Sequence, residues 1–370
     1  MDRSAHWVAL ASLLGRAELR SLLRAVPDGE EAFRLVARRI PPEQRERALA
    51  AAQAGVRRVA GMGGRIVLST DPEYPESLRR IDDPPPLLYC AGPLPLGSSP
   101  AVAVVGTRHP SSYGLQVARR MGADLASVGV TVVSGLAMGV DSAAHRGALE
   151  AGGPTVAVLG TGLDVPYPRS SERLYREIRE RGLLVSEFPP GAPALPWNFP
   201  QRNRIISGLS AGVVVVEAGE RSGTEWTVRW AQKQGKEVLA VPGPVTSRLS
   251  VGPHRLLLEG APMVTCAGDV LQALGLIDVR RAGRQEPAPA SGRNPPASAP
   301  APPPEAGLAR DEARVLRAVG TGSLDPDGLS EASGLPVERV LAALGLLELK
   351  GLVRRCPDGT FHRVEPAGRG

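Results

Sequence analysis

The stretch AVAVVGTRHPSSYGLQVARRMGADLASVGVTVVSGLAMGVDSAAHRGALEAGGPTVAVLG, residues 101–160, decides the fold class of this chain. Three short runs rich in valine, each ending in glycine, lie at 101–106, 130–135 and 155–160. Between them lie two stretches, 116–127 and 140–151, that are expected to be helical. Continuous apolar strands that alternate with helices are typical of a parallel sheet covered by helices on both faces.

The same alternation continues toward the C-terminus. Further apolar runs lie at 183–188, 213–219 and 237–243, and a further helix is expected at 172–181. We therefore predict an α/β domain over residues 63–280. Ligands of such sheets bind outside the carboxyl ends of the strands, so the loops that follow these runs are the places to look for a site.

Two smaller domains and a linker are expected around this sheet. Residues 1–62 carry apolar residues at helical spacing and predict a small helical domain. Residues 281–306 are rich in proline, alanine and serine, which predicts an extended linker. Residues 307–370 fit a helix, a helix-turn-helix and a two-stranded wing, which together make a winged helix.

Composition narrows the class of protein. The 370 residues carry 44 basic and 38 acidic side chains, a net charge of +6, and 41 of the basic residues are arginine. No apolar run approaches the roughly 20 residues of a membrane span, and no secretory signal is expected. Three scattered cysteines, Cys90, Cys266 and Cys356, support neither disulfides nor a thiolate metal site. We expect a cytoplasmic protein without a membrane partner, a metal or a cofactor.

The loop after the first run is Gly106-Thr107-Arg108. Glycine allows a close backbone approach, and the free N–H groups of such a turn can hold an anion beside the arginine. A plain strand-to-helix turn with a solvated Arg108 is the alternative. The GxGxxG pattern of dinucleotide sites is absent.

The loop after the second run, Ser134 to Ala137, opens onto a helix start, which also suits an anion. Asp141 and His145 follow at positions i and i+4 of that helix. They lack the further ligands that a metal site needs, so we expect a structural hydrogen-bonded pair.

The segment PWNFPQRNRII, residues 196–206, combines aromatic and basic side chains in a chain that is only 4% aromatic. Aromatic faces beside cations are what single-stranded nucleic acid requires. Packing of Trp197 and Phe199 against the sheet, with structural arginines, is the alternative. Ser222-Gly223-Thr224 at a later helix start is another candidate phosphate loop.

These residues resemble the DNA-processing protein A (DprA/Smf) family of natural transformation. The resemblance covers residues 74–269 and rests on VVGTR at 104–108, SGLAxGxDxxAH at 134–145, SExP at 186–189 and FPxRNR at 199–204. It implies a Rossmann-like domain that binds single-stranded DNA without catalysis, an N-terminal domain of SAM or helix-hairpin-helix type, and a winged-helix tail. The implied DNA-binding residues are Gly106, Thr107, Arg108, Ser134, Gly135, Arg169, Phe199, Arg202, Asn203, Arg204, Ser222 and Gly223.

The resemblance also implies partners. Family members form homodimers and hand single strands to the RecA recombinase, and the corresponding dimer surface here includes His254, Leu257 and Met263. Two departures stand out: Pro196 occupies a position where relatives can carry lysine, and Glu225-Trp226 replaces small aliphatic residues.

Two other functions remain open from the sequence. Ser222-Gly223-Thr224 is similar to part of the phosphate loop of nucleoside-monophosphate phosphoribohydrolases, but Thr227 stands where that pattern has its catalytic glutamate, and threonine cannot replace a carboxylate. A transcription regulator that binds duplex DNA through the winged helix is the second. For the winged helix alone, duplex binding, docking of a partner and a purely structural role all stay open.

Overall fold

The computed structural model describes residues 4–97, 99–220, 222–276, 310–319, 323–350, 352–355 and 360–363. They fall into two compact units, one within residues 1–287 and one within 288–370. The linker predicted at 281–306 lies outside the described residues. None of the described helices combines the length and the apolar character that a membrane span requires.

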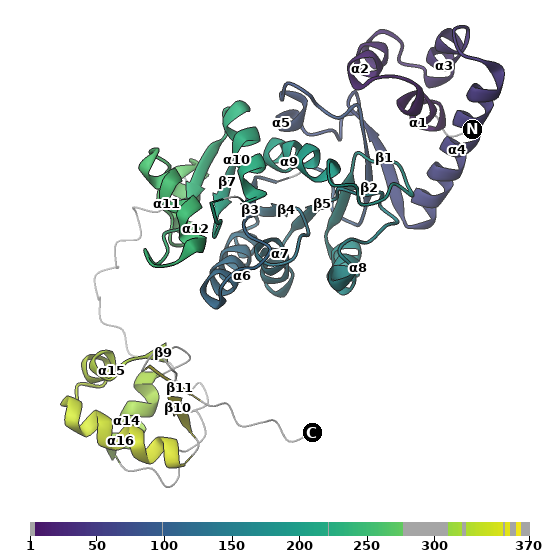
Figure 1. Ribbon diagram of the computed structural model, residues 1–370. Helices are drawn as coiled ribbons and strands as arrows, with labels where there is room; N and C mark the ends of the chain where they lie inside the picture. The colour runs from purple at the N-terminus through teal and green to yellow at the C-terminus, as the bar shows by residue number, and fades with distance from the viewer. Residues whose placement is uncertain are drawn as a thin grey trace, which may run out of the picture. The chain divides into compact units, whose positions relative to one another are not determined.

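The larger unit is built on an eight-stranded sheet with the order β1-β2-β6-β5-β4-β3-β7-β8 (Figure 1). Its strands are β1 Gly64–Leu68, β2 Leu87–Ala91, β3 Ala101–Val105, β4 Thr131–Ser134, β5 Thr155–Val158, β6 Leu183–Ser186, β7 Gly212–Val215 and β8 Glu237–Ala240. The six strands from β6 to β8 are parallel, which confirms the predicted mostly parallel sheet. The antiparallel pair β1 and β2, joined to β6, was not predicted.

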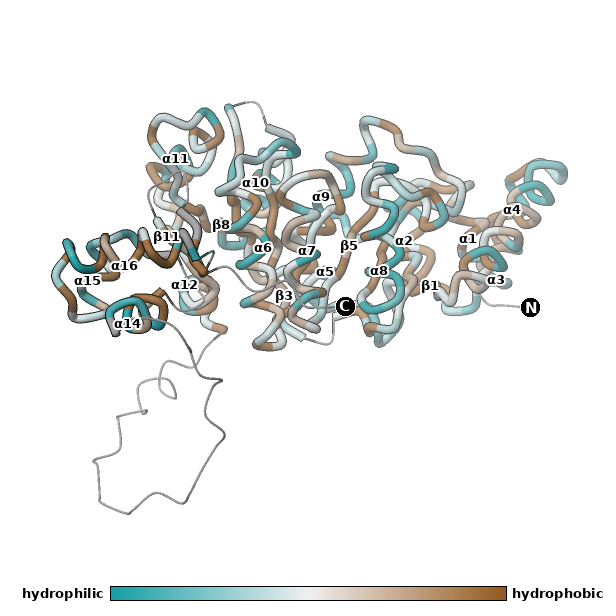
Figure 2. Tube along the Cα trace, turned by 90° about the horizontal axis from the view of Figure 1, so that it is seen from below, coloured by the Kyte–Doolittle hydropathy of each residue, from teal (hydrophilic) through white to brown (hydrophobic). Residues whose placement is uncertain are grey.

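Helices cover both faces of this sheet (Figure 1). One face carries α5 Glu76–Arg79, α9 Asn198–Leu209, α10 Thr224–Lys233 and α11 Val251–Leu258. The other carries α6 Ser112–Ser127, α7 Val140–Glu150, α8 Glu172–Arg181 and α12 Ala267–Ala273. Along β3, Val102 and Val104 point to the α6–α7 side, whereas Ala103 and Val105 point to the α9 side. In Figure 2 much of the trace along the strands is brown, which marks hydrophobic residues.

The order of the strands fixes where a ligand can enter. From β3 the chain runs through β4 and β5 to β6 on one side, and then returns to place β7 and β8 on the other side of β3. The connections after β3 and β7 therefore leave the sheet on opposite faces. A crevice opens at their carboxyl ends, as in other doubly wound sheets.

Four helices precede the sheet: α1 Ser4–Leu13, α2 Arg16–Ala25, α3 Gly29–Ala37 and α4 Pro42–Gly61. Residues 4–61 are thus mostly helical, as the spacing of their apolar residues predicts. They belong to the same compact unit as the sheet. One link is ionic, because Arg16 and Arg20 of α2 both contact Asp83 in the segment between α5 and β2.

The smaller unit contains α14 Arg310–Val319, α15 Pro326–Ser333 and α16 Val337–Leu349, with strands β9 Ser323–Leu324, β10 Val353–Arg355 and β11 Phe361–Arg363. Gly334 ends α15 with a φ of 64°, a left-handed conformation that suits glycine and starts the turn into α16. The winged-helix prediction is confirmed, with β9 as a third strand of the small sheet. Residues 356–359, between the two strands of the wing, lie outside the described residues.

Candidate nucleic-acid interface

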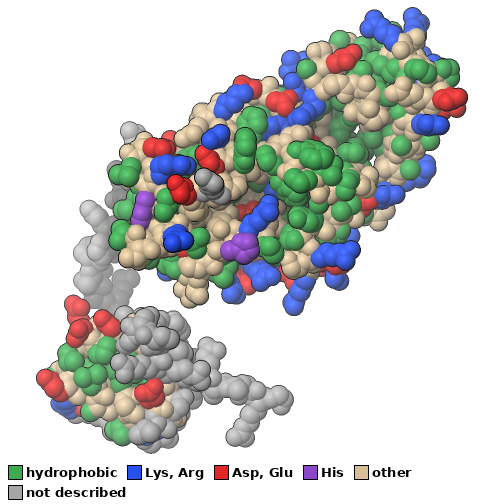
Figure 3. Space-filling model, viewed as in Figure 1, with side chains coloured by type: hydrophobic (Ala, Val, Ile, Leu, Met, Phe, Trp, Pro, Cys, Tyr) green, Lys and Arg blue, Asp and Glu red, His purple; other side chains and the backbone are tan. Residues whose placement is uncertain are grey.

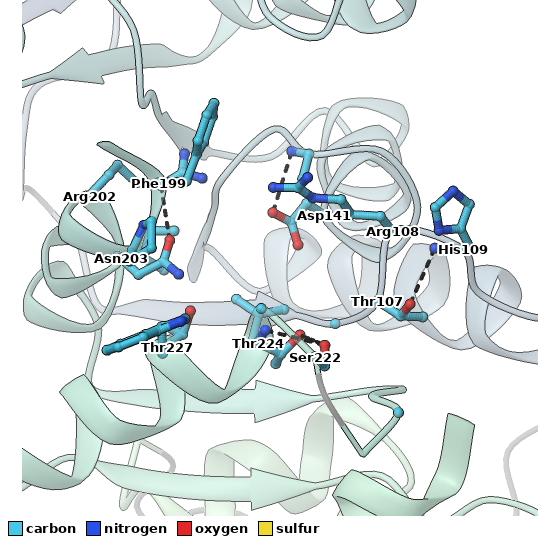
Figure 4. Close-up of a pocket in the computed structure, with 18 of the residues that line it drawn as sticks. Thr107, Arg108, His109, Asp141, Phe199, Arg202, Asn203, Ser222, Thr224 and Thr227 are labelled. Atoms are coloured by element: carbon cyan, nitrogen blue, oxygen red, sulfur yellow. Dashed lines mark hydrogen bonds between the residues drawn. The ribbon is translucent and has the colours of Figure 1, made fainter. Parts of the chain in front are cut away.

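A cavity of about 590 Å³ lies at the carboxyl ends of β3 and β7, and we call it the groove. Figure 3 shows this face hollowed, with basic and hydrophobic side chains at the edge of the hollow. Eight of the twelve predicted DNA-binding residues line the groove: Gly106, Thr107, Arg108, Phe199, Arg202, Asn203, Ser222 and Gly223. In Figure 4, Arg108 enters from the loop after β3, while Phe199 and Asn203 come from α9.

Arg108 is the exposed cation of the groove. Its guanidinium carbon lies 5.8 Å from the centre of the Phe199 ring, in cation–π geometry. Among the residues that the structure describes, no carboxylate forms an ion pair with Arg108, whereas Arg202 and Arg204 are both buried. Arg108 is therefore available to a phosphate at the place where a base would meet Phe199.

The loop that carries Arg108 is held from two sides. The backbone oxygen of Glu217, at the end of β7, accepts the Thr107 N–H at 2.7 Å, and its carboxylate accepts the N–H and hydroxyl of Ser111 at 2.9 and 2.6 Å. On the other side Gly139, with a φ of 81°, lies so close that a Cβ would be 2.5 Å from the Thr107 oxygen. Only glycine fits there, so Gly139 and Glu217 together hold the loop in this conformation.

Phe199 is half-buried and lies against Tyr167 and Gly160. Its ring lies 5.3 Å from that of Tyr167, and a Cβ added to Gly160 would lie 2.8 Å from its edge. The helix α9 begins at Asn198, whose amide donates to the Gly160 oxygen at 3.1 Å. These contacts hold one edge of the Phe199 ring, and the rest of the ring faces the groove.

Arg202 lines the groove but is buried, and its guanidinium donates hydrogen bonds to backbone carbonyl oxygens. It donates to the carbonyl oxygen of Gly135 at 2.8 Å and to that of Val158, joining the ends of β4 and β5. Burial, with the charge of Arg108 adding to it, lowers the pKa of Arg202 to about 10. Arg202 therefore shapes the groove, whereas the resemblance implied a DNA contact.

Asp141 lines the groove together with Arg202. Burial raises the pKa of its carboxyl group, and the charge of Arg202 and the N–H groups of Ala137 and Gly135 oppose this without cancelling it. The expected hydrogen bond to His145 is wrong. Asp141 accepts from the backbone of Gly135 at 3.1 Å, while His145 Nδ1 contacts the hydroxyl of Thr155 at 2.7 Å.

The position of Arg204 contradicts its predicted contact with DNA most clearly. Arg204 is 1% exposed, and its guanidinium donates to both carboxylate oxygens of Glu187 at 2.7 Å. It also donates to the backbone oxygen of Asp83 at 3.0 Å. Two positions along α9 from Arg202, it points away from the groove, because residues i and i+2 lie on different faces of a helix.

Three further predicted residues do not line the groove. The Ser134 hydroxyl is buried and donates to the Val104 oxygen at 2.7 Å. Gly135 is buried against Arg202, where a Cβ would lie 2.5 Å from its guanidinium nitrogen. Arg169 is exposed in a short 3-10 helix, Arg169–Ser171, just after Tyr167, which does line the groove.

The candidate phosphate loop at the start of α10 is present. The hydroxyl of Ser222 donates to that of Thr224 at 2.9 Å, and both line the groove (Figure 4). The groove is also lined by residues outside the predicted set, among them His109, Tyr167, Trp226 and Thr227. A sequence signal existed for Tyr167 and Trp226, since aromatic residues are rare in this chain, but only the fold shows which of them face the groove.

The predicted dimer residues gather at the β8 edge of the sheet. Met263 is exposed and forms a bridge to Ala240, the last residue of β8. Leu257 packs partly against the core, and His254 Nε2 contacts the Gly243 oxygen at 3.0 Å. Leu258, which was not predicted, is 89% exposed beside them.

Across the described part of the chain, no group of three His, Cys, Asp or Glu side chains is placed to hold a metal ion. Cys90 is buried and Cys266 exposed, both as free thiols. The third cysteine, Cys356, lies outside the described residues.

Comparisons with known proteins found matches over most of the chain. The family described as DNA recombination-mediator protein A matches residues 65–275, and a DprA winged helix domain matches residues 299–359. A putative DNA processing protein DprA from Mycobacterium tuberculosis is 39% identical over 322 residues, covering 83% of this chain and 79% of that protein. Protein Smf of Escherichia coli is 41% identical over 289 residues, covering 77% of this chain and 74% of that protein.

Solved structures show the same relationship. The crystal structure of DNA processing protein A from Streptococcus pneumoniae matches with a TM-score of 0.58 and 36% identity, over 73% of this chain and 92% of that one. A DNA processing protein A from Helicobacter pylori, described for its single-stranded DNA binding mode, matches with a TM-score of 0.52 and 30% identity, over 58% of this chain and 96% of that one. The chain belongs to the DNA recombination-mediator protein A family.

Proposed function

We propose that the groove binds single-stranded DNA without making or breaking a bond, and that the chain protects incoming strands and passes them to a RecA recombinase. The observation that carries the binding is Arg108, an exposed arginine that stands over the Phe199 ring at the switch point of the sheet. A cation beside an aromatic face takes a phosphate and its base together, without a preference for sequence. Handover to a recombinase rests on membership of the family.

A catalytic role finds little support in the groove. Among the described residues that line it, Asp141 is the one with a carboxylate, and that carboxylate accepts two backbone N–H groups. Thr227 occupies the position at which a phosphoribohydrolase needs glutamate. We therefore propose a binding protein rather than a nucleotide-hydrolysing enzyme, and steady release of base from nucleoside monophosphates would contradict this.

We also propose a homodimer through the α11 edge and action in the cytoplasm, where a recombinase handles DNA. The exposed Leu258 and Met263 next to the edge strand β8 support the dimer, since burying them would remove apolar surface from water. Sedimentation tests it: Leu258→Glu should halve the mass of the wild-type particle, and a wild type that already sediments as a monomer contradicts the dimer.

From the side chains that the structure describes, we infer that the winged helix docks a partner protein rather than duplex DNA. The single arginine of α16, Arg339, pairs with Asp311, and Lys350 after α16 pairs with Glu312. The exposed side chains of α16 include Leu341 and Leu346. Apolar side chains exposed on α16 suit a protein partner, whereas duplex DNA is contacted mainly through polar and basic side chains.

Titration with labelled single-stranded oligonucleotides in increasing salt tests the binding. One phosphate contact to single-stranded DNA contributes about 0.7 to the slope of log affinity against log salt. Between about 50 and about 200 mM salt, wild type should therefore lose about 2.6-fold more affinity than Arg108→Ala. Arg120→Ala, an exposed arginine of α6, is the matched control and should leave the slope unchanged. Equal slopes for wild type and Arg108→Ala would contradict the proposal.

A further inference from the structure

Three of the four tryptophans in this chain gather around α9 and α10. The fourth, Trp7, is 1% exposed in the core of the N-terminal helices, as expected for so large an apolar ring. Trp226 is 48% exposed and lines the groove, Trp230 is half-buried one turn further along α10, and Trp197 is exposed just before α9. Exposed tryptophan beside a candidate binding groove requires an explanation other than the core.

On α10 these rings alternate with cations. Trp226, Arg229, Trp230 and Lys233 lie at positions i, i+3, i+4 and i+7, so they share one face of the helix, and we call them the α10 stripe. The Arg229 guanidinium carbon lies 5.6 Å from the centre of the Trp226 ring, and Lys233 Nζ lies 5.5 Å from that of Trp230. The stripe extends about 10 Å from the groove, at 1.5 Å per residue.

The stripe is attached to the wall of the groove. Trp230 Nε1 donates to the carbonyl oxygen of Pro200 at 3.0 Å, directly after Phe199, and α9 and α10 pack against each other. Figure 3 shows hydrophobic and basic side chains side by side over these helices, next to the hollow. The α10 stripe therefore begins at the groove, where Trp226 lies, and runs away from it along the helix.

The charges of the stripe are already paired at the surface. Arg229 contacts Glu225 at 2.8 Å and Lys233 contacts Asp82 at 3.3 Å. Exposed pairs of this kind contribute little free energy, so a phosphate can replace the carboxylate at small cost. The local charge is balanced, and attraction by the α10 stripe must therefore come mainly from stacking on the rings.

We propose that the α10 stripe is a second contact site for the same single strand, in which a base stacks on Trp226 and the next phosphates lie along Arg229 and Lys233. This inference rests on the proposed function, because it extends the path of a strand held at Arg108 and Phe199. Tryptophan and arginine are also common in protein interfaces. The opening of Trp226 into the same groove as Phe199 favours a nucleic acid instead.

The test compares wild type, Trp226→Ala and Trp226→Phe in the full chain, titrated with oligo-dT of increasing length. A base that stacks on an aromatic side chain contributes about 5- to 140-fold in affinity. Trp226→Ala should lose an amount in this range on long oligonucleotides, Trp226→Phe should keep most of the affinity, and the salt slope should stay unchanged. Leu35→Ala on α3, a side chain with a comparable exposed fraction of 44%, is the control.

An oligonucleotide of the same length without bases separates stacking from other effects. Trp226→Ala should bind this abasic strand as wild type does, and an equal loss on both strands would overturn the proposal. Fluorescence offers a second measurement that does not depend on folding of the alanine variant. In a Trp197→Phe/Trp230→Phe protein only Trp7 and Trp226 remain, and single-stranded DNA should quench the exposed ring.

The outcomes distinguish the two proposals. If Arg108→Ala and Phe199→Ala weaken binding while Trp226→Ala leaves it unchanged at every length, and Trp226 fluorescence is not quenched, the α10 stripe is not a DNA site and the proposed function stands. If wild type binds no single-stranded DNA, the proposed function itself fails.

Discussion

Replacing Arg204 by alanine separates a structural arginine from a DNA contact. The Arg204–Glu187 pair is almost fully buried, with side-chain exposures of 1% and 6% and two N–O distances of 2.7 Å. Removing one partner of such a pair leaves an uncompensated charge and costs about 3–5 kcal/mol. Arg16 lies 3.5 Å from the Glu187 carboxylate and can compensate in part, so we expect the lower end, about 3 kcal/mol.

The assay is urea unfolding followed by circular dichroism, for Arg204→Ala, Glu187→Leu and the double variant Arg204→Met/Glu187→Leu. A buried ion pair replaced as a whole by apolar side chains is often close to neutral, so the double variant should recover most of the lost stability. In DNA titrations of folded protein, the salt slope of Arg204→Ala should equal that of wild type. A variant as stable as wild type, with a slope smaller by about 0.7, would refute our interpretation and place Arg204 on a phosphate.

Two further predictions follow from the groove and its neighbourhood. Gly160→Ala should weaken single-strand binding by up to about 3 kcal/mol with the fold intact, because a Cβ would lie 2.8 Å from the Phe199 ring and displace it. Gly61→Ala at the end of α4, away from the groove, is the control, because an added Cβ would meet nothing within 4 Å. Equal affinities of Gly160→Ala and wild type would contradict the prediction. Burial, together with the charge of Arg202, lowers the pKa of His145 to about 3, whereas the unfolded value is about 6.5. The stability that neutral His145 contributes is therefore complete above about pH 6.5 and is lost as the pH falls toward 3, so the free energy of unfolding should fall between about pH 7 and 5 in wild type and less steeply in His145→Gln.

The sequence by itself determined the sheet and the place of the site. Runs such as AVAVVG at 101–106 place apolar side chains on both faces of a strand. This pattern is local, because it requires a strand that is buried on both faces, whichever strands pair with it. Once strands alternate with helices, the loops at the carboxyl ends are the places for a ligand. Eight of the twelve residues that the family resemblance implied line the groove, and five of these, Gly106, Thr107, Arg108, Ser222 and Gly223, lie in the loops after β3 and β7.

Only the tertiary structure decided which arginine is free. Arg108, Arg202 and Arg204 look alike in the sequence, yet only Arg108 is exposed. Arg202 bonds carbonyl oxygens at the ends of β4 and β5, and Arg204 bonds Glu187 and Asp83. These partners lie 17 to 121 positions away along the chain. The charge of an arginine is fixed by its chemistry, but its availability depends on burial and on acceptors that the fold brings near it, and no local pattern contains that information.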